Sequence, residues 1–186
     1  MFIPTENTPN PNAIKFLPGF DISPIEPIFF ASINDASISG LAVKLFEIDG
    51  VKAVFFGSDF ITLTKEENID WAIVKPYALM IIMDHFTAGF QVFRKQNNEE
   101  QEEVVKREFS NIELEIIELL DTRIRPSVAV DGGDIVFVSF ENGIVKLKLK
   151  GACAGCPSSS ITLKNGIENM LKHYIPEVES IEEVVE

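Results

Sequence analysis

Basic residues are scarce in this chain of 186 amino acids, which has 16 Lys and Arg against 29 Asp and Glu and a net charge of −13. Both halves share the deficit: residues 1–88 hold 5 basic and 11 acidic side chains, and residues 111–186 hold 7 and 13. Nucleic-acid binding depends on basic patches that neutralise phosphates, and anionic membrane surfaces also attract basic segments. We therefore expect neither a nucleic-acid partner nor a membrane partner.

Long hydrophobic runs are also missing. The uninterrupted apolar segment from Ala78 to Met83 ends at Asp84, far short of the ~18 residues that a membrane-spanning helix needs. The first residues, MFIPTENTPNPN, lack both the basic-then-apolar pattern of a signal peptide and the Arg-rich character of a transit peptide. We expect the protein to stay where it is made, in a bacterial cytoplasm. The alternative is a mitochondrial matrix protein whose transit peptide has been removed.

Cysteine is nearly absent, with only Cys153 and Cys156 in the whole chain. Two cysteines do not make a disulfide framework of the kind that stabilises small secreted proteins. Their Cys-x-x-Cys spacing is instead typical of a reactive or metal-binding site.

A polar, mixed-charge segment over residues 89–110 separates two parts of the chain and predicts a linker between two small α+β domains. In residues 1–88 the TPNPN segment (8–12) is either a simple turn or a partner-docking loop. The expected elements of this domain are strands at Phe2–Thr5 and Ala13–Leu17, a helix at Ser39–Phe46, a hairpin of Val51–Phe56 and Phe60–Thr64, and a helix at Ile69–Phe86, kinked or divided at Pro76 and stopped near Gly89.

The C-terminal domain, residues 111–186, is predicted as an α-β-β-α-β unit with two helices on a three-stranded sheet. Its first helix carries an apolar stripe from Ile112 to Ile124 and should end before Pro126. DGGD (131–134) predicts a turn, and Asn142-Gly143 predicts a two-residue hairpin turn. The register counted from that turn places Phe140 opposite Val145, Val138 opposite Leu147 and Val136 opposite Leu149, with Lys146, Lys148 and Lys150 on the other face. A helix ending at Pro176 and a strand over 178–185 complete the unit.

Both thiols lie in the loop between the second strand and the second helix. Pro157 suits the first helical position, which puts Cys156 near the N-cap, where the helix dipole favours the thiolate. Thiol–disulfide exchange, half of a zinc site and half of an iron–sulfur site all use this spacing. His173 would be about 25 Å away along the helix, and His85 lies in the other domain, so neither suits a fourth-ligand role. Two chains would supply four sulfurs, and the residues alone leave the three chemistries open.

The segments DGGDI, NG and GACAGCPSSSITLKNGIENMLKHYIPEV strongly resemble the C-terminal domain of NifU-like (Nfu-type) iron–sulfur cluster proteins, and MFIPTENTPNPNAIKFLPG resembles the N-terminal domain of the same family. The resemblance implies a [4Fe–4S] cluster bridged between the two subunits of a homodimer, with Cys153 and Cys156 as ligands, and it leaves a [2Fe–2S] form open. It also implies apo iron–sulfur client proteins and upstream assembly proteins as partners, and a carrier instead of an enzyme.

Two alternatives use the same cysteines. The first is an enzyme, a thiol–disulfide oxidoreductase, although no Trp or Gly-Pro accompanies the pair and a hairpin precedes it where a parallel crossover is expected. The second is an interaction module stabilised by zinc, which would lose its fold on chelation.

Overall fold

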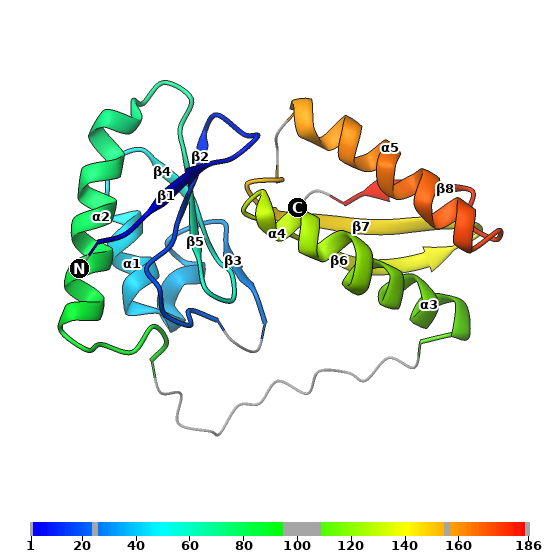
Figure 1. Ribbon diagram of the computed structural model, residues 1–186, viewed down its shortest axis with the longest axis horizontal. Coiled ribbons are helices and arrows are strands. Elements are labelled where there is room, and N and C mark those ends of the chain that lie inside the picture. Colours follow the sequence, from blue (N-terminus) through cyan, green and yellow to red (C-terminus); the bar gives the residue numbers. More distant parts are fainter. Residues whose placement is uncertain (1, 24–25, 95–108, 155–156, 185–186) are drawn as a thin grey trace.

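The computed structural model describes residues 2–23, 26–94, 109–154 and 157–184. These residues form two sheets, each with a hydrophobic core and helices of its own (Figure 1). The predicted α+β class with two domains is confirmed.

The N-terminal sheet has five strands in the order β1-β2-β5-β4-β3, and all neighbouring pairs are antiparallel. The expected hairpin of β4 and β5 is present, while β3 had not been predicted. The strands are β1 (Thr5–Asn7), β2 (Ala13–Phe16), β3 (Ile28–Phe30), β4 (Val51–Phe56) and β5 (Ile61–Lys65).

Two helices cover one face of this sheet. The helix α1 (Gly40–Phe46) is capped by the Ser39 hydroxyl, which accepts from the Ala42 N–H. The longer helix α2 (Trp71–Thr87) continues through Pro76 as one element, so of the two outcomes expected there, a kink or a division, the division is wrong. It ends near Gly89, as predicted, and this glycine adopts a φ of +70° just beyond the helix. Residues beyond the helix still contact this domain, since Ser39 donates to the Val92 carbonyl.

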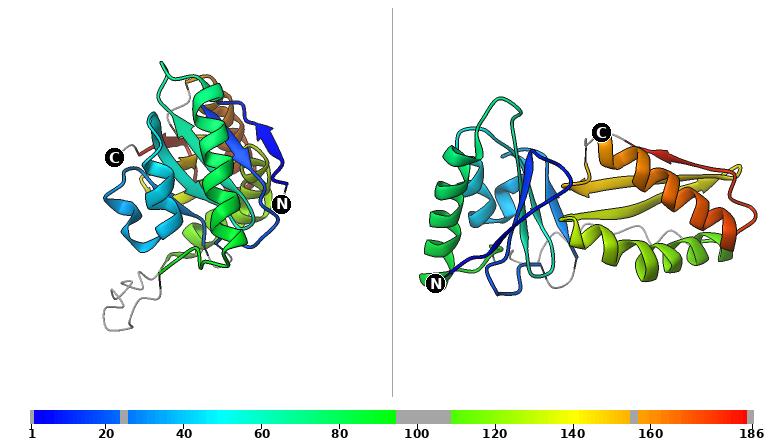
Figure 2. Two further views of the ribbon diagram at one scale, coloured as in Figure 1. Left: turned by 90° about the vertical axis from the view of Figure 1, so that its left-hand side faces the viewer. Right: turned by 45° about the horizontal axis from the view of Figure 1, so that its top comes forward.

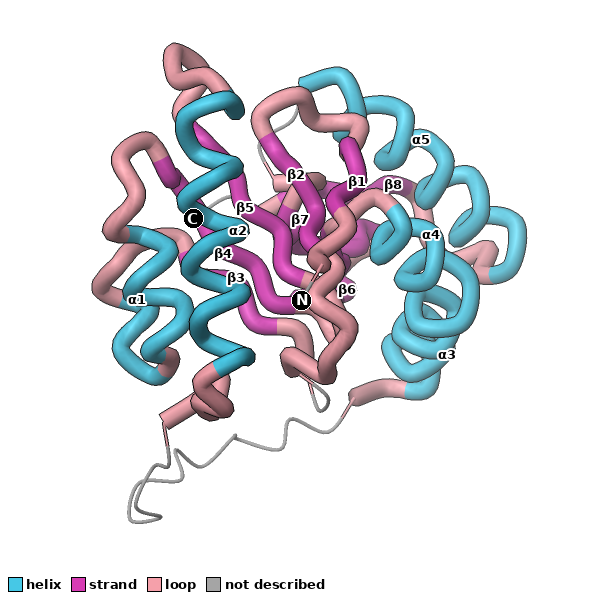
Figure 3. Tube along the Cα trace, turned by 60° about the vertical axis from the view of Figure 1, so that its left-hand side comes forward, coloured by secondary structure: helices cyan, strands magenta, loops and turns pink. Residues whose placement is uncertain are grey.

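Strand alternation divides the sheet into two faces. One face packs on α1 and α2 through the apolar side chains Ile14, Phe16, Val54, Phe56, Ile61 and Leu63. The opposite face, called here the open face because no helix of its own domain covers it, carries Lys15, Thr62 and Phe55. These three residues are direct neighbours across β2, β5 and β4. Figures 1 and 3 show α1 and α2 on one side of this sheet and the C-terminal domain on the other.

The first C-terminal helix does not end before Pro126. The helix α3 (Asn111–Leu119) begins with a capping box formed by Ser110 and Glu113, and it passes through a π-helical turn (Leu120–Ile124) into α4 (Arg125–Val130). Pro126 occupies the start of α4, where a missing N–H costs least. The prediction of a stop was wrong, because a π-helical turn with i→i+5 hydrogen bonds joins α3 to α4 immediately before the proline, and the backbone stays helical.

The C-terminal sheet has the order β6-β7-β8, with β6 (Gly133–Glu141) antiparallel to β7 (Ile144–Gly151) and β8 (Ser180–Glu183) parallel to β7. The Asn142-Gly143 turn is present, both residues have positive φ, and Phe140 pairs with Val145 as predicted. Beyond that point the predicted register was wrong. A β-bulge at Val138 pairs Phe137 with Leu147 and Val136 with Lys148, and it leaves Val138 39% exposed.

The helix α5 (Pro157–Tyr174) begins at Pro157, as expected, and shares one face of the sheet with α3 and α4 (Figure 3). Ile116, Leu120 and Ile167 from these helices pack with the sheet in one buried cluster, which confirms the predicted layering. Glu168 of α5 accepts a hydrogen bond from the Ile181 N–H and so holds β8 against the helix. Among the helices in the described part of the chain, none is long and apolar enough to cross a membrane.

Candidate functional site

The loop that carries the cysteines starts where β7 ends at Gly151. This residue has a φ of +66°, and its carbonyl accepts from the Ala154 N–H, so the chain turns sharply out of the strand. The Ala152 N–H donates to the Gly132 carbonyl, and Gly133 pairs with Gly151. The first part of the loop is thus tied to the glycine-rich turn that precedes β6.

Cys153 faces inward. Its side chain belongs to the buried cluster of the C-terminal domain, and the residue is 5% exposed. A Cβ atom at Gly133 would lie 2.7 Å from the Cys153 Sγ, so the absence of a side chain there makes room for the sulfur. Cys156 and the N-cap position predicted for it lie outside the described residues.

The N-terminal domain contacts the same loop through hydrogen bonds to main-chain carbonyls. The Asn10 Nδ2 donates to the Ala152 carbonyl at 3.0 Å, and the Thr62 Oγ1 donates to the Gly132 carbonyl at 2.8 Å. Asn10 is 6% exposed and Thr62 is fully buried. The ends of the two domains that meet here are visible in Figure 2, where β6 and β7 reach the N-terminal sheet.

Lys15 and Phe55 extend this contact on either side of Thr62. The Lys15 Nζ lies 3.2 Å from the Ala129 carbonyl and 3.5 Å from the Val130 carbonyl, at the end of α4 where a cation suits the helix dipole. A Cβ at Gly151 would lie 2.8 Å from the Phe55 Cδ1, which shows how closely the ring approaches the end of β7. The open face of the sheet is therefore occupied by the cysteine-bearing end of the C-terminal domain.

The two histidines are not brought to this loop. His85 lies on α2, across the N-terminal sheet from the open face, and His173 lies in the last turn of α5. Burial and the charge of Lys44 lower the pKa of His85. Within the described ranges, no three His, Cys, Asp or Glu side chains lie close enough together to hold a metal ion.

The DGGD turn has a structural role. Gly132 has a φ of +79°, as a turn requires, and Asp134 is 5% exposed. The Arg125 Nε lies 3.2 Å from the Asp134 Oδ1 and also donates to the Ile135 carbonyl, so the carboxylate is compensated.

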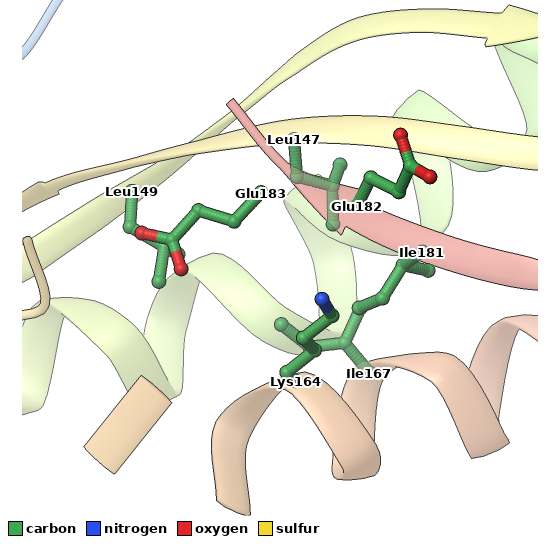
Figure 4. A pocket seen from close by; sticks show the side chains of 7 residues that line it. All are labelled: Leu147, Leu149, Lys164, Ile167, Ile181, Glu182 and Glu183. Carbon is green, nitrogen blue, oxygen red and sulfur yellow. The ribbon is translucent and has the colours of Figure 1, made fainter. Parts of the chain in front are cut away.

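A shallow pocket lies between α5 and the strands β7 and β8 (Figure 4). Its floor is aliphatic, and Lys164 and Glu183 lie at its sides. Among the described residues, no thiol or imidazole lines it, so its chemistry does not suit iron or zinc. The lining residues are Leu147, Leu149, Lys164, Ile167, Ile181, Glu182 and Glu183.

The contacts of Asn10, Lys15 and Thr62 were missed by the sequence analysis. The one available signal was the TPNPN segment, for which a docking loop was one of two interpretations. Lys15 and Thr62 alternate with apolar residues along β2 and β5, which indicates a polar face but not what covers it.

Comparison with known proteins assigns both halves of the chain. Residues 3–89 match the family described as scaffold protein Nfu/NifU N terminal, and residues 116–182 match the NifU-like domain. The chain belongs to the NifU-like, Nfu-type family. The NifU-like match spans the β6–β7 hairpin, the cysteine loop and α5.

Relatives of this Nfu-type chain include two proteins named NFU1 iron-sulfur cluster scaffold homolog, mitochondrial. The one from Drosophila willistoni is 50% identical over 99% of this chain and 64% of its own length, and the one from Drosophila persimilis is 51% identical over 99% and 65%. The chain thus spans less than two thirds of these relatives. Their names match the alternative compartment, the mitochondrion, and give no support to the first expectation of a bacterial cytoplasm.

Among solved structures, the NifU-like protein from Saccharomyces cerevisiae is 28% identical, with a TM-score of 0.47 over 52% of this chain and 87% of that chain.

Proposed function

We propose that this Nfu-type chain carries an iron–sulfur cluster as cargo, binds it through Cys153 and Cys156, and passes it to apoproteins. The observation that carries the proposal is the Cys-x-x-Cys in a glycine-flanked strand-to-helix loop of a NifU-like domain. The names of the relatives, which describe iron–sulfur cluster scaffolds, support it.

The cargo in this proposal is a [4Fe–4S] cluster shared between two subunits. One chain has two thiols, and a cubane cluster takes four protein ligands, so two chains complete the set. A ligand set divided across an interface is halved when the subunits separate. A client protein's cysteines can then replace the thiolates one after another, which suits transfer better than permanent retention.

The proposed partners are apo iron–sulfur proteins, upstream assembly proteins and a second copy of the chain, in a mitochondrial matrix. The chain acts in this proposal as a carrier without catalytic activity of its own. Its domains are residues 1–88 and 111–186, joined by the linker 89–110. The net charge of −13 disfavours nucleic acid as a partner.

Anaerobic reconstitution with iron and sulfide tests the function. We expect about four iron and four sulfide per two chains, a brown dimer by size-exclusion chromatography, and transfer of the colour to an apo-acceptor. Cys153→Ser should abolish binding and keep the far-ultraviolet circular dichroism spectrum. Ala154→Ser is the matched control, because it adds a hydroxyl to the same loop and removes no thiol.

Two other results would replace the proposal. A colourless monomer that cycles between dithiol and disulfide would favour the oxidoreductase. Bound zinc after anaerobic purification, with unfolding on chelation, would favour a structural metal. A dimer with two iron and two sulfide would keep the carrier function and change the cluster to [2Fe–2S].

A further inference from the structure

Polar side chains on and beside the open face of the N-terminal sheet are buried and bond to the C-terminal domain. Lys15 also lies 3.6 Å from Glu6 in its own sheet. Thr62 is 0% exposed, Asn10 6% and Lys15 9%. Burying such groups is unfavourable unless they find hydrogen-bond partners, and here the partners are carbonyls of the C-terminal domain. The composition of this face therefore matches an occupant that presents main-chain carbonyls.

The contacted carbonyls surround Cys153. The Ala152 carbonyl, bonded by Asn10, belongs to the peptide unit that leads into Cys153. The Gly132 carbonyl, bonded by Thr62, also accepts the Ala152 N–H. Both polar groups of Ala152 are thus occupied, one from each domain, and the direction in which the Cys153 side chain leaves the backbone is fixed.

In this arrangement the sulfur points into the core of the C-terminal domain. The Sγ of Cys153 packs over the Cα of Gly133 in the hydrophobic core. An iron–sulfur cluster bridged between two chains instead needs thiolates at the protein surface. The hydrogen bond from Asn10 restrains the peptide unit that leads into this inward-facing side chain.

We propose that the open face of the N-terminal sheet docks the chain's own cysteine loop and holds Cys153 inward, so that docking and cluster loading exclude one another. The inference rests on the proposed function for its loading half only. Asn10 acts as the positioning residue, and the TPNPN segment serves as the docking loop that presents its side chain. Loading a cluster separates the domains, and releasing it lets them dock again.

Asn10→Asp tests the docking selectively. The Asn10 Oδ1 accepts from the Asn12 N–H and shapes the loop, and Asp keeps this acceptor. It replaces the Nδ2 donor by an oxygen that repels the Ala152 carbonyl. Asn12→Asp is the matched control, because it adds the same charge to the same segment and its side chain bonds Lys65 within the N-terminal domain. Thr62→Val provides a second, uncharged variant that loses the bond to Gly132.

The first readout is the rate of Cys153 alkylation by iodoacetamide in a Cys156→Ser background, where only one thiol is left. Loss of one hydrogen bond shifts the opening equilibrium by about three- to tenfold, so Asn10→Asp and Thr62→Val should react faster by that factor. Asn12→Asp should react at the parent rate. A larger radius of gyration by small-angle scattering, with an unchanged urea midpoint, would show that domain separation and not unfolding exposes the thiol.

Equal alkylation rates in all variants would overturn the proposal, because the C-terminal domain alone would then bury the thiol. Cluster loading is measured separately with both cysteines present, and Asn10→Asp should load faster than Asn12→Asp. Faster alkylation with equal loading rates would also overturn the claim of exclusion. A chain that binds no iron–sulfur cluster would contradict the proposed function. Alkylation and scattering use no iron, so these two measurements would still test the docking of the cysteine loop.

Discussion

Replacing Gly151 by Ala should destabilise the C-terminal domain strongly. An L-residue at the observed φ of +66° costs about 1–2 kcal/mol. The new Cβ would also lie 2.6 Å from the Gly132 carbonyl oxygen and 2.9 Å from the Gly133 Cα. Both are backbone atoms, so relief requires a shift of the β6–β7 end at a further cost of about 1–3 kcal/mol. We expect a total loss of about 3 kcal/mol in the free energy of unfolding.

Urea denaturation measures this loss if the two domains are followed separately. Trp71 is the only tryptophan and lies in α2, so its fluorescence reports the N-terminal domain. The far-ultraviolet circular dichroism signal reports both domains. The part of the circular dichroism change that has no counterpart in the fluorescence therefore reports the C-terminal domain. The urea midpoint of this part should fall for Gly151→Ala.

Gly166→Ala is the matched control in the same domain. Gly166 lies exposed in α5, and a Cβ there would meet no atom within 4 Å. Alanine should therefore stabilise the helix by about 0.5–1 kcal/mol. Changes of opposite sign in the free energy of unfolding for the two glycine variants would support this reasoning. A Gly151→Ala free energy of unfolding within about 0.5 kcal/mol of wild type would refute it.

Three further substitutions test separate features by urea unfolding. Arg125→Met leaves the buried Asp134 carboxylate without its cation and should lower the free energy of unfolding by about 2 kcal/mol, less than for a fully buried pair because the arginine is half-buried. The Arg125→Met/Asp134→Asn double variant should recover stability, and no recovery would contradict the unpaired carboxylate as the cause. Ser110→Ala removes the capping-box hydroxyl of α3 and should cost about 1 kcal/mol, while an unchanged midpoint would show that the cap contributes nothing. Burial lowers the pKa of His85 below its usual 6.5, so the unfolded chain takes up a proton first as the pH falls, and stability should drop from about pH 6.5 downward. His85→Gln should remove that part of the pH dependence, and identical pH profiles would exclude His85 as its source.

The two errors in the C-terminal domain have local physical causes. The Asn-Gly turn correctly predicted the pairing of Phe140 with Val145, but a turn specifies the register only as far as the ladder stays regular. The bulge at Val138 exchanges the faces of the remaining strand, so that Ile135 and Phe137 enter the core in place of the smaller Val136 and Val138. Burial of the larger pair favours this arrangement, and simple alternation does not weigh side-chain size.

The candidate site was predictable only in part. The Cys-x-x-Cys motif and the start of α5 at Pro157 follow from local chemistry. The hydrogen bonds of Asn10 to Ala152 and of Thr62 to Gly132 join residues 142 and 70 positions apart. Such contacts depend on how two folded surfaces fit together, and no local pattern encodes them.

The parallel pairing of β8 with β7 determines the order in which the chain can fold during synthesis. Ile181 of β8 belongs to the C-terminal core, so this domain lacks part of its core until residue 181 has been made. The N-terminal sheet and its two helices are complete at residue 87, a hundred residues or so earlier. Domains made first generally fold first during synthesis. The cysteine loop is therefore made after the surface that Asn10 and Thr62 present to it has folded.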